Sequence, residues 1–340
     1  MLRNRTVFKK YDLGEKMKWM IIVLVFFLAV SAVSAADNQT FTNLQDIIDQ
    51  TPENGVVNLT SDYTYSDGDS QITISHPLTI NGNNHILNGK SKTVIMIVYS
   101  DNVILNNITF TNGYASDGSG ALEANNATVT NCIFTNNHGD NGGAIYSSKG
   151  KIDHCTFINN SADYDGGALV LSDSTITNSL FDNNHATNGG AVLSTEGMIF
   201  NCRFINNHAD LDGGAVYSYL GNVERSSFIN NSAGLTGGAL NLVIAKAKDC
   251  YFENNSAKYY GGAIFNEEGE VENCTFKNNS AWKGNDVYSP SNYDDIDINS
   301  NRSNGREKVF HITCDTDSTG NPLGLLLAGL ALPISRKLKR

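Results

Sequence analysis

The sequence predicts an all-β solenoid, in which short strands wind into stacked coils around one shared core. Two observations carry this prediction: a unit of 23 or 24 residues repeats along the chain, and no apolar stripe of helical period runs through it. A unit of this length is too short for a strand–helix–strand module of about 30 residues. It fits one coil of a solenoid, which depends on its neighbours for burial of its apolar side chains.

A phenylalanine marks each of the eight visible units. These residues are Phe110, Phe134, Phe157, Phe181, Phe204, Phe228, Phe252 and Phe276. Two residues before each phenylalanine stands Ile, Cys or Ser, and side chains two apart on a strand point the same way. We predict that both columns point inward, where coils about 4.8 Å apart turn them into continuous ladders.

Asparagine and glycine recur with the same period. Three residues after seven of the phenylalanines stand Asn137, Asn160, Asn184, Asn207, Asn231, Asn255 and Asn279. Six glycine pairs follow: Gly142 and Gly143, Gly166 and Gly167, Gly189 and Gly190, Gly213 and Gly214, Gly237 and Gly238, and Gly261 and Gly262. We expect the asparagines at bends, in left-handed backbone or bonded to the next coil, and the glycines at a corner that needs positive φ.

Five of the six cysteines belong to the column two residues before phenylalanine. They are Cys132, Cys155, Cys202, Cys250 and Cys274, and Cys314 has no evident partner. We expect buried free thiols, although a bridge between adjacent coils is conceivable for Cys132 with Cys155 and for Cys250 with Cys274. The chain contains no Cys-x-x-Cys motif, which argues against a zinc or iron–sulfur site.

The glycine pairs and the Phe-x-x-Asn motif resemble the repeat of chlamydial polymorphic membrane proteins. The motif reads GGAI at Gly142 and Gly261, GGAL at Gly166 and Gly237, and GGAV at Gly189 and Gly213. The same repeat occurs in adhesin-like surface proteins of methanogenic archaea. The resemblance implies a right-handed parallel β-helix of the pectin-lyase-like type, and it implies surface display, although fold alone does not dictate function.

The N-terminal third of the chain is predicted to hold a signal and a cap. Residues 1–36 form a signal peptide, because an apolar run over residues 20–33 follows two lysines and small residues favour cleavage after Ala36 or Ala35. Met17 is an alternative start, and an uncleaved signal anchor is the alternative to cleavage. Residues 37–104 hold irregular first coils and an amphipathic helix over residues 41–50 that covers the open strand edges.

The regular repeats fill residues 105–288, and two further segments follow them. Residues 289–321 are polar, which predicts a flexible spacer. Residues 322–340 join an apolar run to a basic tail, which predicts a membrane anchor or a sorting segment. This ending resembles that of the archaeal proteins. The alternative is a hydrophobic terminus without a role. The net charge of −11 argues against nucleic acid and anionic membrane surfaces as partners.

The sequence assigns no catalytic, cofactor or metal residue. Asp165 and Asp212 each stand directly before a glycine pair, and two coils separate them by about 10 Å. That separation is near the upper limit for the two carboxyl groups of an inverting glycosidase, but aspartate is common before glycine in turns. His138, His185 and His208 share a column, and Asp140 and Asp210 follow nearby. Other coils have serine in this column, which favours a solvated bend over a metal site. Weak Ca²⁺ binding by aspartate-rich turns stays open.

Glycosylation is expected at several sequons if the host has the machinery. Their asparagines are Asn38, Asn58, Asn107, Asn126, Asn159, Asn230, Asn254, Asn273 and Asn278.

The pattern as a whole predicts a non-catalytic, adhesin-like or structural protein on the cell exterior, attached to membrane or wall. Its expected partners are a host or neighbouring cell surface, glycans or cell wall, and the membrane through the C-terminal segment. The alternative is a polysaccharide lyase or glycoside hydrolase on the same scaffold, and a third reading is a wall spacer that binds nothing. Coils of 23 or 24 residues leave little length for loops that would wall an active-site cleft.

Overall fold

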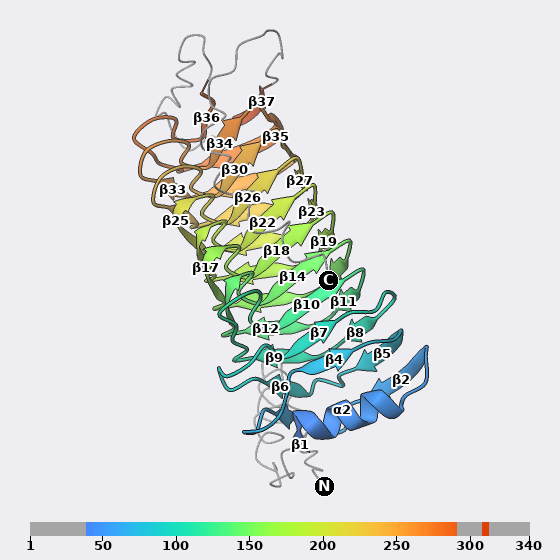
Figure 1. The fold of residues 1–340 in the computed structure, drawn as a ribbon. Coiled ribbons are helices and arrows are strands. Elements are labelled where there is room, and N and C mark those ends of the chain that lie inside the picture. The colour runs from blue at the N-terminus through green and yellow to red at the C-terminus, as the bar shows by residue number, and fades with distance from the viewer. Residues whose placement is uncertain (1–38, 291–307, 313–340) are drawn as a thin grey trace, which may run out of the picture.

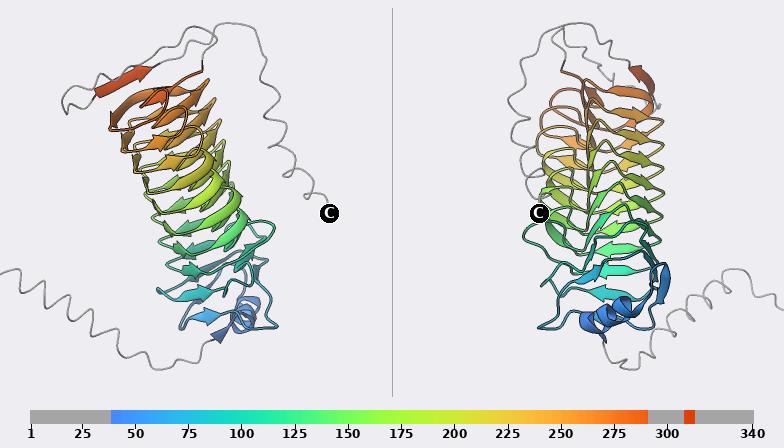
Figure 2. Two further views of the ribbon diagram at one scale, coloured as in Figure 1. Left: turned by 90° about the vertical axis from the view of Figure 1, so that its left-hand side faces the viewer. Right: turned by 45° about the vertical axis from the view of Figure 1, so that its right-hand side comes forward.

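The computed structural model describes residues 39–290 and 308–312, which form one parallel β-solenoid (Figure 1). Most coils contribute three or four short strands, and each strand pairs in parallel with its equivalent in the next coil. The strands therefore stack into sheets that run along the rod, and one elongated apolar core lies between them (Figure 2). The predicted all-β solenoid is confirmed.

The largest sheet contains two rows of strands. The aliphatic row is β2 (Gly55–Asn58), β5 (Leu78–Asn81), β8 (Ile104–Asn106), β11 (Thr128–Thr130), β15 (Lys151–Asp153), β19 (Thr175–Thr177), β23 (Met198–Phe200), β27 (Asn222–Glu224), β31 (Lys246–Lys248) and β35 (Glu270–Lys277). The phenylalanine row is β1 (Gln39–Thr40), β3 (Tyr63–Thr64), β6 (Ile86–Asn88), β9 (Thr109–Thr111), β12 (Ile133–Thr135), β16 (Thr156–Ile158), β20 (Leu180–Asp182), β24 (Arg203–Ile205), β28 (Ser227–Ile229) and β32 (Tyr251–Glu253). The long strand β35 pairs in both rows and so joins them.

Two further sheets complete the coils. The second sheet is β4 (Ile72–Ile74), β7 (Met96–Val98), β10 (Leu122–Asn125), β14 (Ile145–Ser148), β18 (Leu169–Ser172), β22 (Val192–Thr195), β26 (Val216–Tyr219), β30 (Leu240–Val243), β34 (Ile264–Glu267) and β36 (Val287–Tyr288). The third sheet is β13 (His138–Asn141), β17 (Ser161–Asp165), β21 (His185–Asn188), β25 (His208–Asp212), β29 (Ser232–Ala233) and β33 (Ser256–Ala257).

The phenylalanines form one stack through the core. Each pairs in register with the phenylalanine of the next coil, and neighbouring ring centroids lie 4.7 to 5.2 Å apart. The same column continues towards the N-terminus through Leu87 and Tyr63, where no phenylalanine marks it. The first coils therefore share the register of the later ones, although their sequences look irregular.

The asparagines of the Phe-x-x-Asn motif form a buried hydrogen-bond ladder. Asn184 donates its side-chain Nδ2 to Asn207 Oδ1 at 2.9 Å, and its backbone N–H donates to the same oxygen at 3.0 Å. Asn207 Nδ2 in turn donates to the backbone oxygen of Phe181 at 3.1 Å. Left-handed backbone lies one residue earlier than we expected, at exposed residues such as Asn206 (φ 55°), because a side chain at the bend itself points out to water.

The two glycines of each pair serve different purposes. The first has positive φ, as at Gly189 (φ 56°), which the sequence predicts. The second lies against the next coil: a Cβ at Gly190 would sit 2.2 Å from the backbone oxygen of Gly214 and 2.3 Å from that of His208. That close approach, rather than positive φ, excludes a side chain at the second position.

Helix α2 (Phe41–Gln50) lies across the N-terminal end of the rod (Figure 1). A capping box of Thr40 and Asn43 starts the helix, and its apolar face buries Phe41, Leu44 and Ile48. Gln45 donates to the backbone oxygen of Thr73 at 3.0 Å and accepts from its N–H at 2.7 Å. The helix therefore satisfies backbone groups at the open edge of β4, as a cap must.

An antiparallel strand lies on the aliphatic and phenylalanine rows at their C-terminal edge. It is β37 (Lys308–Ile312), which pairs with β35. The sequence predicts a flexible spacer over residues 289–321, but this part of it is a strand. The unpaired edge of β35 offers a row of backbone donors and acceptors, which explains why an alternating segment pairs there.

The five cysteines of the repeat are free thiols buried in the core. Burial raises the pKa of Cys202 to about 12, so that this thiol stays protonated at physiological pH. Several other predictions fall on parts of the chain outside the described residues. These are the signal peptide with its cleavage site, the sequon at Asn38, Cys314, most of the spacer, and the segment 322–340.

We predict that replacing a ladder asparagine destabilises the rod far more than replacing its exposed neighbour. Asn207→Ala would leave the buried backbone N–H of Asn184 without its acceptor and would remove the hydrogen bond from Asn207 Nδ2 to the oxygen of Phe181, at a cost of about 3 kcal/mol in unfolding free energy. Asn206→Gly keeps a residue suited to positive φ and should change it by less than about 0.5 kcal/mol. Urea denaturation followed by circular dichroism measures both; equal losses would contradict the ladder.

Candidate functional site

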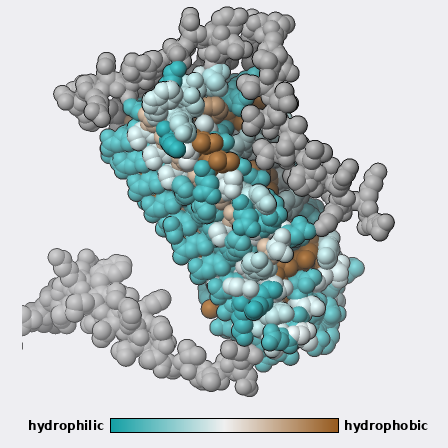
Figure 3. Space-filling view, turned by 60° about the vertical axis from the view of Figure 1, so that its left-hand side comes forward, coloured by the Kyte–Doolittle hydropathy of each residue, from teal (hydrophilic) through white to brown (hydrophobic). Residues whose placement is uncertain are grey.

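Side chains that point away from the core differ from coil to coil. Figure 3 shows the side of the rod that carries the third sheet, where hydrophilic side chains stand in rows and hydrophobic ones gather in small separate patches. Four groups of these outward residues could carry a function: a polar ladder, an acidic corner, a histidine column and an aromatic cluster.

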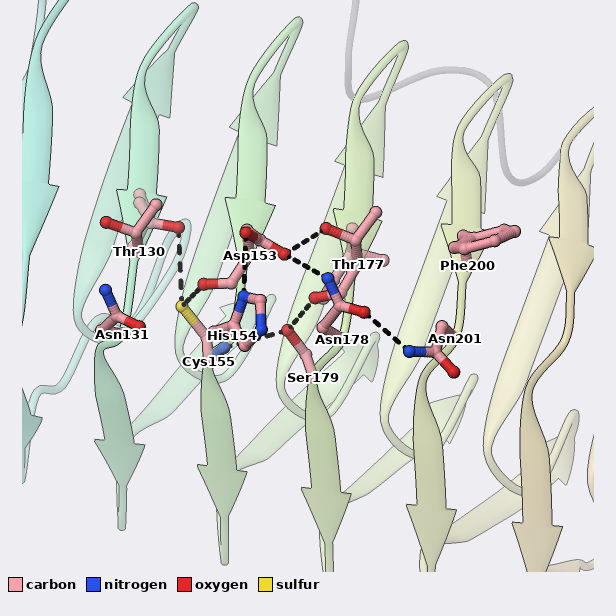
Figure 4. Close-up of polar contacts among 12 residues, drawn as sticks. Thr130, Asn131, Asp153, His154, Cys155, Thr177, Asn178, Ser179, Phe200 and Asn201 are labelled. Atoms are coloured by element: carbon pink, nitrogen blue, oxygen red, sulfur yellow. Dashed lines mark hydrogen bonds and ion pairs between the residues drawn. The ribbon is translucent and has the colours of Figure 1, made fainter.

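The polar ladder runs along the outer face of the aliphatic row (Figure 4). Asp153 accepts hydrogen bonds from Thr177 and, at 2.8 Å, from Asn178, and His154 Nδ1 lies 2.9 Å from its other oxygen. Asn178 accepts in turn from Asn201 at 2.7 Å. Burial disfavours ionisation of Asp153, but these hydrogen bonds outweigh it and lower its pKa to about 2. The bonds among Asp153, Thr177, Asn178 and Asn201 join neighbouring coils, so this ladder ties coils together.

The acidic corner is the column directly before the glycine pairs. Register places Asp165, Asn188 and Asp212 on three successive coils, as the spacing predicts. Asn188 donates to Asp165 at 3.1 Å, and Thr236 donates to Asp212 at 2.6 Å. Burial raises the pKa of both carboxyls above the ordinary value, and these hydrogen bonds oppose the rise.

A tyrosine of the second sheet belongs to the same corner. Burial raises the pKa of Tyr217 to about 12, and the carboxylates of Asp212, Glu267 and Asp165 add to the effect. The phenol therefore stays protonated and cannot act as a base at neutral pH. In the described part of this column, a cation stands only at Lys283, three coils beyond Asp212. The corner thus joins acidic groups without a basic partner.

The histidine column lies on the outer face of the third sheet. His185 and His208 are paired in register with their rings stacked at 5.4 Å, whereas His138 stacks on Tyr114 at 5.6 Å. Asp210 joins these two histidines, because its Oδ1 lies 3.0 Å from His185 Nε2 and 3.5 Å from His208 Nε2. Asp140, the other aspartate of the sequence analysis, does not join this group; its pKa is raised by burial and by Asp117 and Asp163.

The aromatic cluster lies at the C-terminal end of the rod. Its members are Tyr259, Tyr260, Phe265, Trp282 and Tyr288. The ring of Tyr260 lies 4.6 Å from that of Tyr288 and 5.8 Å from that of Trp282. Trp282 is 73% exposed and Tyr259 is 40% exposed. The cluster therefore combines a supported aromatic base with two rings open to solvent.

Sequence analysis missed this cluster. The signal was present, because Tyr260 stands in a column that holds Asn, Asp or Thr in the preceding coils. Contact among rings from three separate segments could not be predicted from the repeat, because Trp282 lies in the last, irregular coil. Four asparagines of sequons are exposed at bends with positive φ: Asn159, Asn230, Asn254 and Asn278.

Two family models match the chain. The first, described as "Right handed beta helix region", covers residues 65–235, which is half of the sequence. The second, described as "Chlamydia polymorphic membrane protein repeat", covers residues 249–267. No curated protein matches. In the portion of the chain that the structure covers, no helix has the length and apolar character required to cross a bilayer.

Two solved structures have a similar fold. One is the PL6 family alginate lyase AlyGC, with a TM-score of 0.56 and 10% identity over 74% of this chain and 39% of the lyase. The other is the alginate lyase AlyF-OU02 in complex with G6, with a TM-score of 0.50 and 12% identity over 75% of this chain and 60% of the lyase. The chain spans less than two thirds of either lyase, and at such identity the likeness concerns the fold alone.

We predict that Asp153 makes the stability of the rod sensitive to acid. Because its pKa is lower when folded (about 2) than in the unfolded chain (3.8), its contribution is full above pH 4 and is lost as pH falls towards 2. Asp153→Asn should cost about 1 kcal/mol at pH 6 and almost nothing at pH 2. Thermal unfolding across this pH range measures the gap in stability between the parent chain and Asp153→Asn. Thr177→Val removes one of the hydrogen bonds to Asp153 and should lower the stability at pH 6 by part of that gap. A gap that stays constant with pH would contradict the assignment.

Proposed function

Because the chain belongs to the right-handed β-helix family, we propose that it is a non-catalytic rod on the cell surface that makes contact with glycans, cell wall or a neighbouring or host cell. The match to a Chlamydia polymorphic membrane protein repeat supports a surface role. The adhesin-like role, and any archaeal relationship, rest on the resemblance of the repeats.

The observation that carries the proposal is the contrast between inward and outward positions. The constant positions of the repeat, such as Phe181, Asn184 and Gly190, are buried or shape a corner. Apart from the asparagine at the positive-φ bend, outward positions change from coil to coil, so the repeat preserves a scaffold and no set of reactive groups. A stiff rod about 50 Å long with a varied surface suits display and contact better than it suits turnover.

We propose that the aromatic cluster makes the contact. Trp and Tyr are enriched where proteins bind partners, because their rings offer a large rigid surface with a polar tip. The exposed rings of Trp282 and Tyr259 can pack against the C–H face of a sugar, while Lys258 and Lys283 lie 5.0 and 5.6 Å from the ring centroids of Tyr259 and Tyr288. The chemistry fits an anionic glycan.

Export and attachment are further parts of the proposal. The signal in residues 1–36 would send the chain out of the cytoplasm, and residues 322–340 would hold it at the membrane or wall. Exposed sequons such as Asn159 and Asn230 would then be open to glycosylation.

The second candidate is a polysaccharide lyase or glycoside hydrolase. Two solved structures with a similar fold are alginate lyases, and Asp165 and Asp212 are carboxyls with raised pKa. The candidate is weaker because β-elimination at a uronate needs a base together with a group that neutralises the carboxylate. Among the residues that the structure describes, this column has no such cation near Asp212, and only three residues separate β25 from β26.

We predict that the aromatic cluster determines binding to cell-surface glycans. Removing exposed hot-spot rings from a binding surface costs at least about 1.4 kcal/mol, so a Trp282→Ala, Tyr259→Ala double variant should bind about tenfold more weakly. Tyr164→Ala is the matched control, since Tyr164 is 59% exposed but lies in β17, away from the cluster. Binding of the purified protein to an array of anionic and neutral glycans is the measurement. Equal binding by the double variant would remove the cluster from the proposal.

We also predict that the protein does not cleave polysaccharides. Incubation with alginate, pectin and cell-wall polysaccharide should release no unsaturated uronates and no new reducing ends, with an active alginate lyase as the positive control. Product that disappears in Asp165→Asn or Asp212→Asn would establish the enzyme instead.

A further inference from the structure

Three side chains with metal-binding atoms meet on the outer face of the third sheet. His185 comes from β21, and His208 and Asp210 come from β25 of the next coil. Their ligand atoms all lie within 4.8 Å of one another. The side chains are 48%, 48% and 55% exposed, so an ion from solution can reach them.

Two of the three ligand spacings fit a tetrahedral ion. Ligand atoms about 2.0 to 2.2 Å from Zn²⁺ lie about 3.3 Å apart in a tetrahedron. Asp210 Oδ1 lies 3.0 Å from His185 Nε2 and 3.5 Å from His208 Nε2, which brackets that value. We propose that His185 Nε2, His208 Nε2 and Asp210 Oδ1 bind a divalent transition-metal ion of the Zn²⁺ class, with water at the fourth position.

The fold brings these ligands together on adjacent coils. The backbones of His185 and His208 are paired in register, and their rings stack with an interplanar angle of 6°, so the exposed rings must turn for both Nε2 lone pairs to point at one ion. His208 Nδ1 lies 2.8 Å from Ser232 Oγ, and this contact turns Nε2 towards the carboxylate. Such a partner at the second ring nitrogen orients histidine ligands in metal sites generally.

The ligand set selects the class of ion. Ca²⁺ and Mg²⁺ take six or more oxygen ligands, whereas two imidazoles with one carboxylate suit Zn²⁺, Ni²⁺ or Cu²⁺. The site therefore differs from the weak Ca²⁺ binding that aspartate-rich turns suggest. The sequence alone favours a solvated bend because serine fills this column in the other coils.

The repeat supplies an incomplete copy of the same arrangement. His138 pairs in register with Ser161 of the next coil, and Asp163 Oδ1 lies 3.6 Å from His138 Nε2. These residues occupy the positions of His185, His208 and Asp210, with serine in place of the second histidine. Two ligands do not hold an ion firmly, so we expect no tight binding at this copy.

The test removes the complete site and completes the incomplete one. His208→Ser installs the residue that this column already has in other coils, so the variant keeps its fold, and circular dichroism verifies this. We expect it to bind Zn²⁺ at least tenfold more weakly than the parent in calorimetric titration with Zn²⁺ alone, and Asp210→Asn to weaken binding as well. Ser161→His should add a second equivalent of bound Zn²⁺.

Co²⁺ provides a spectroscopic readout, because tetrahedral Co²⁺ absorbs strongly in the visible range. The band should form in the parent chain, fade in His208→Ser and grow in Ser161→His, and excess Ca²⁺ should leave it unchanged. Zn²⁺ titrations of His208→Ser that match the parent overturn the site. If Ser161→His binds no second equivalent of Zn²⁺, then two histidines on adjacent coils with an aspartate two residues after the second are not enough to bind the ion.

Discussion

Parallel stacking of nearly identical coils is the constraint on which the rest of this structure depends. The backbone of each coil can satisfy its donors and acceptors only by pairing with the coils on either side. The asparagine ladder reinforces this pairing inside the turns, because each side chain bonds to both the preceding and the following coil, as Asn207 does with Asn184, Phe181 and Asn231. The Phe stack then fills the space that the paired backbones enclose.

The same stacking builds the outer surface. A side chain at one position is repeated at the coil spacing, so that like residues form arrays: stacked histidines, alternating Asp and Asn at the corner, and the Asp153, Thr177 and Asn178 ladder. Function can therefore arise from a change in one coil, without any change in the scaffold. The second histidine at position 208 and the tyrosine at position 260 are two such changes.

The periodic features could be predicted from the sequence, because each of them appears many times. Their spacing and side-chain chemistry predict the inward phenylalanines and the buried cysteines. The apolar pattern of residues 41–50 predicts the capping helix in the same way, although it occurs once. Features that depend on contact between coils could not be predicted. The second glycine of each pair is required by the carbonyl of the next coil, as at Gly190, and the bend residue is Asn206 rather than Asn207. Asp210 approaches His185 only because the coils stack in register, and β37 pairs with β35 across a long separation in sequence.

The most direct test of this account is removal of one whole coil. Deleting residues 181–203 joins Leu180 to Phe204, which already occupies the register position of Phe181, whereas deleting residues 181–192 removes about half a coil and joins strands of different sheets. Thermal unfolding by circular dichroism, with the rod length from small-angle scattering, should show the whole-coil variant folded, cooperative and shorter by about 4.8 Å, and the half-coil variant severely destabilised. If the two deletions had the same effect on stability, the coils would not be held by register, and this account would be wrong.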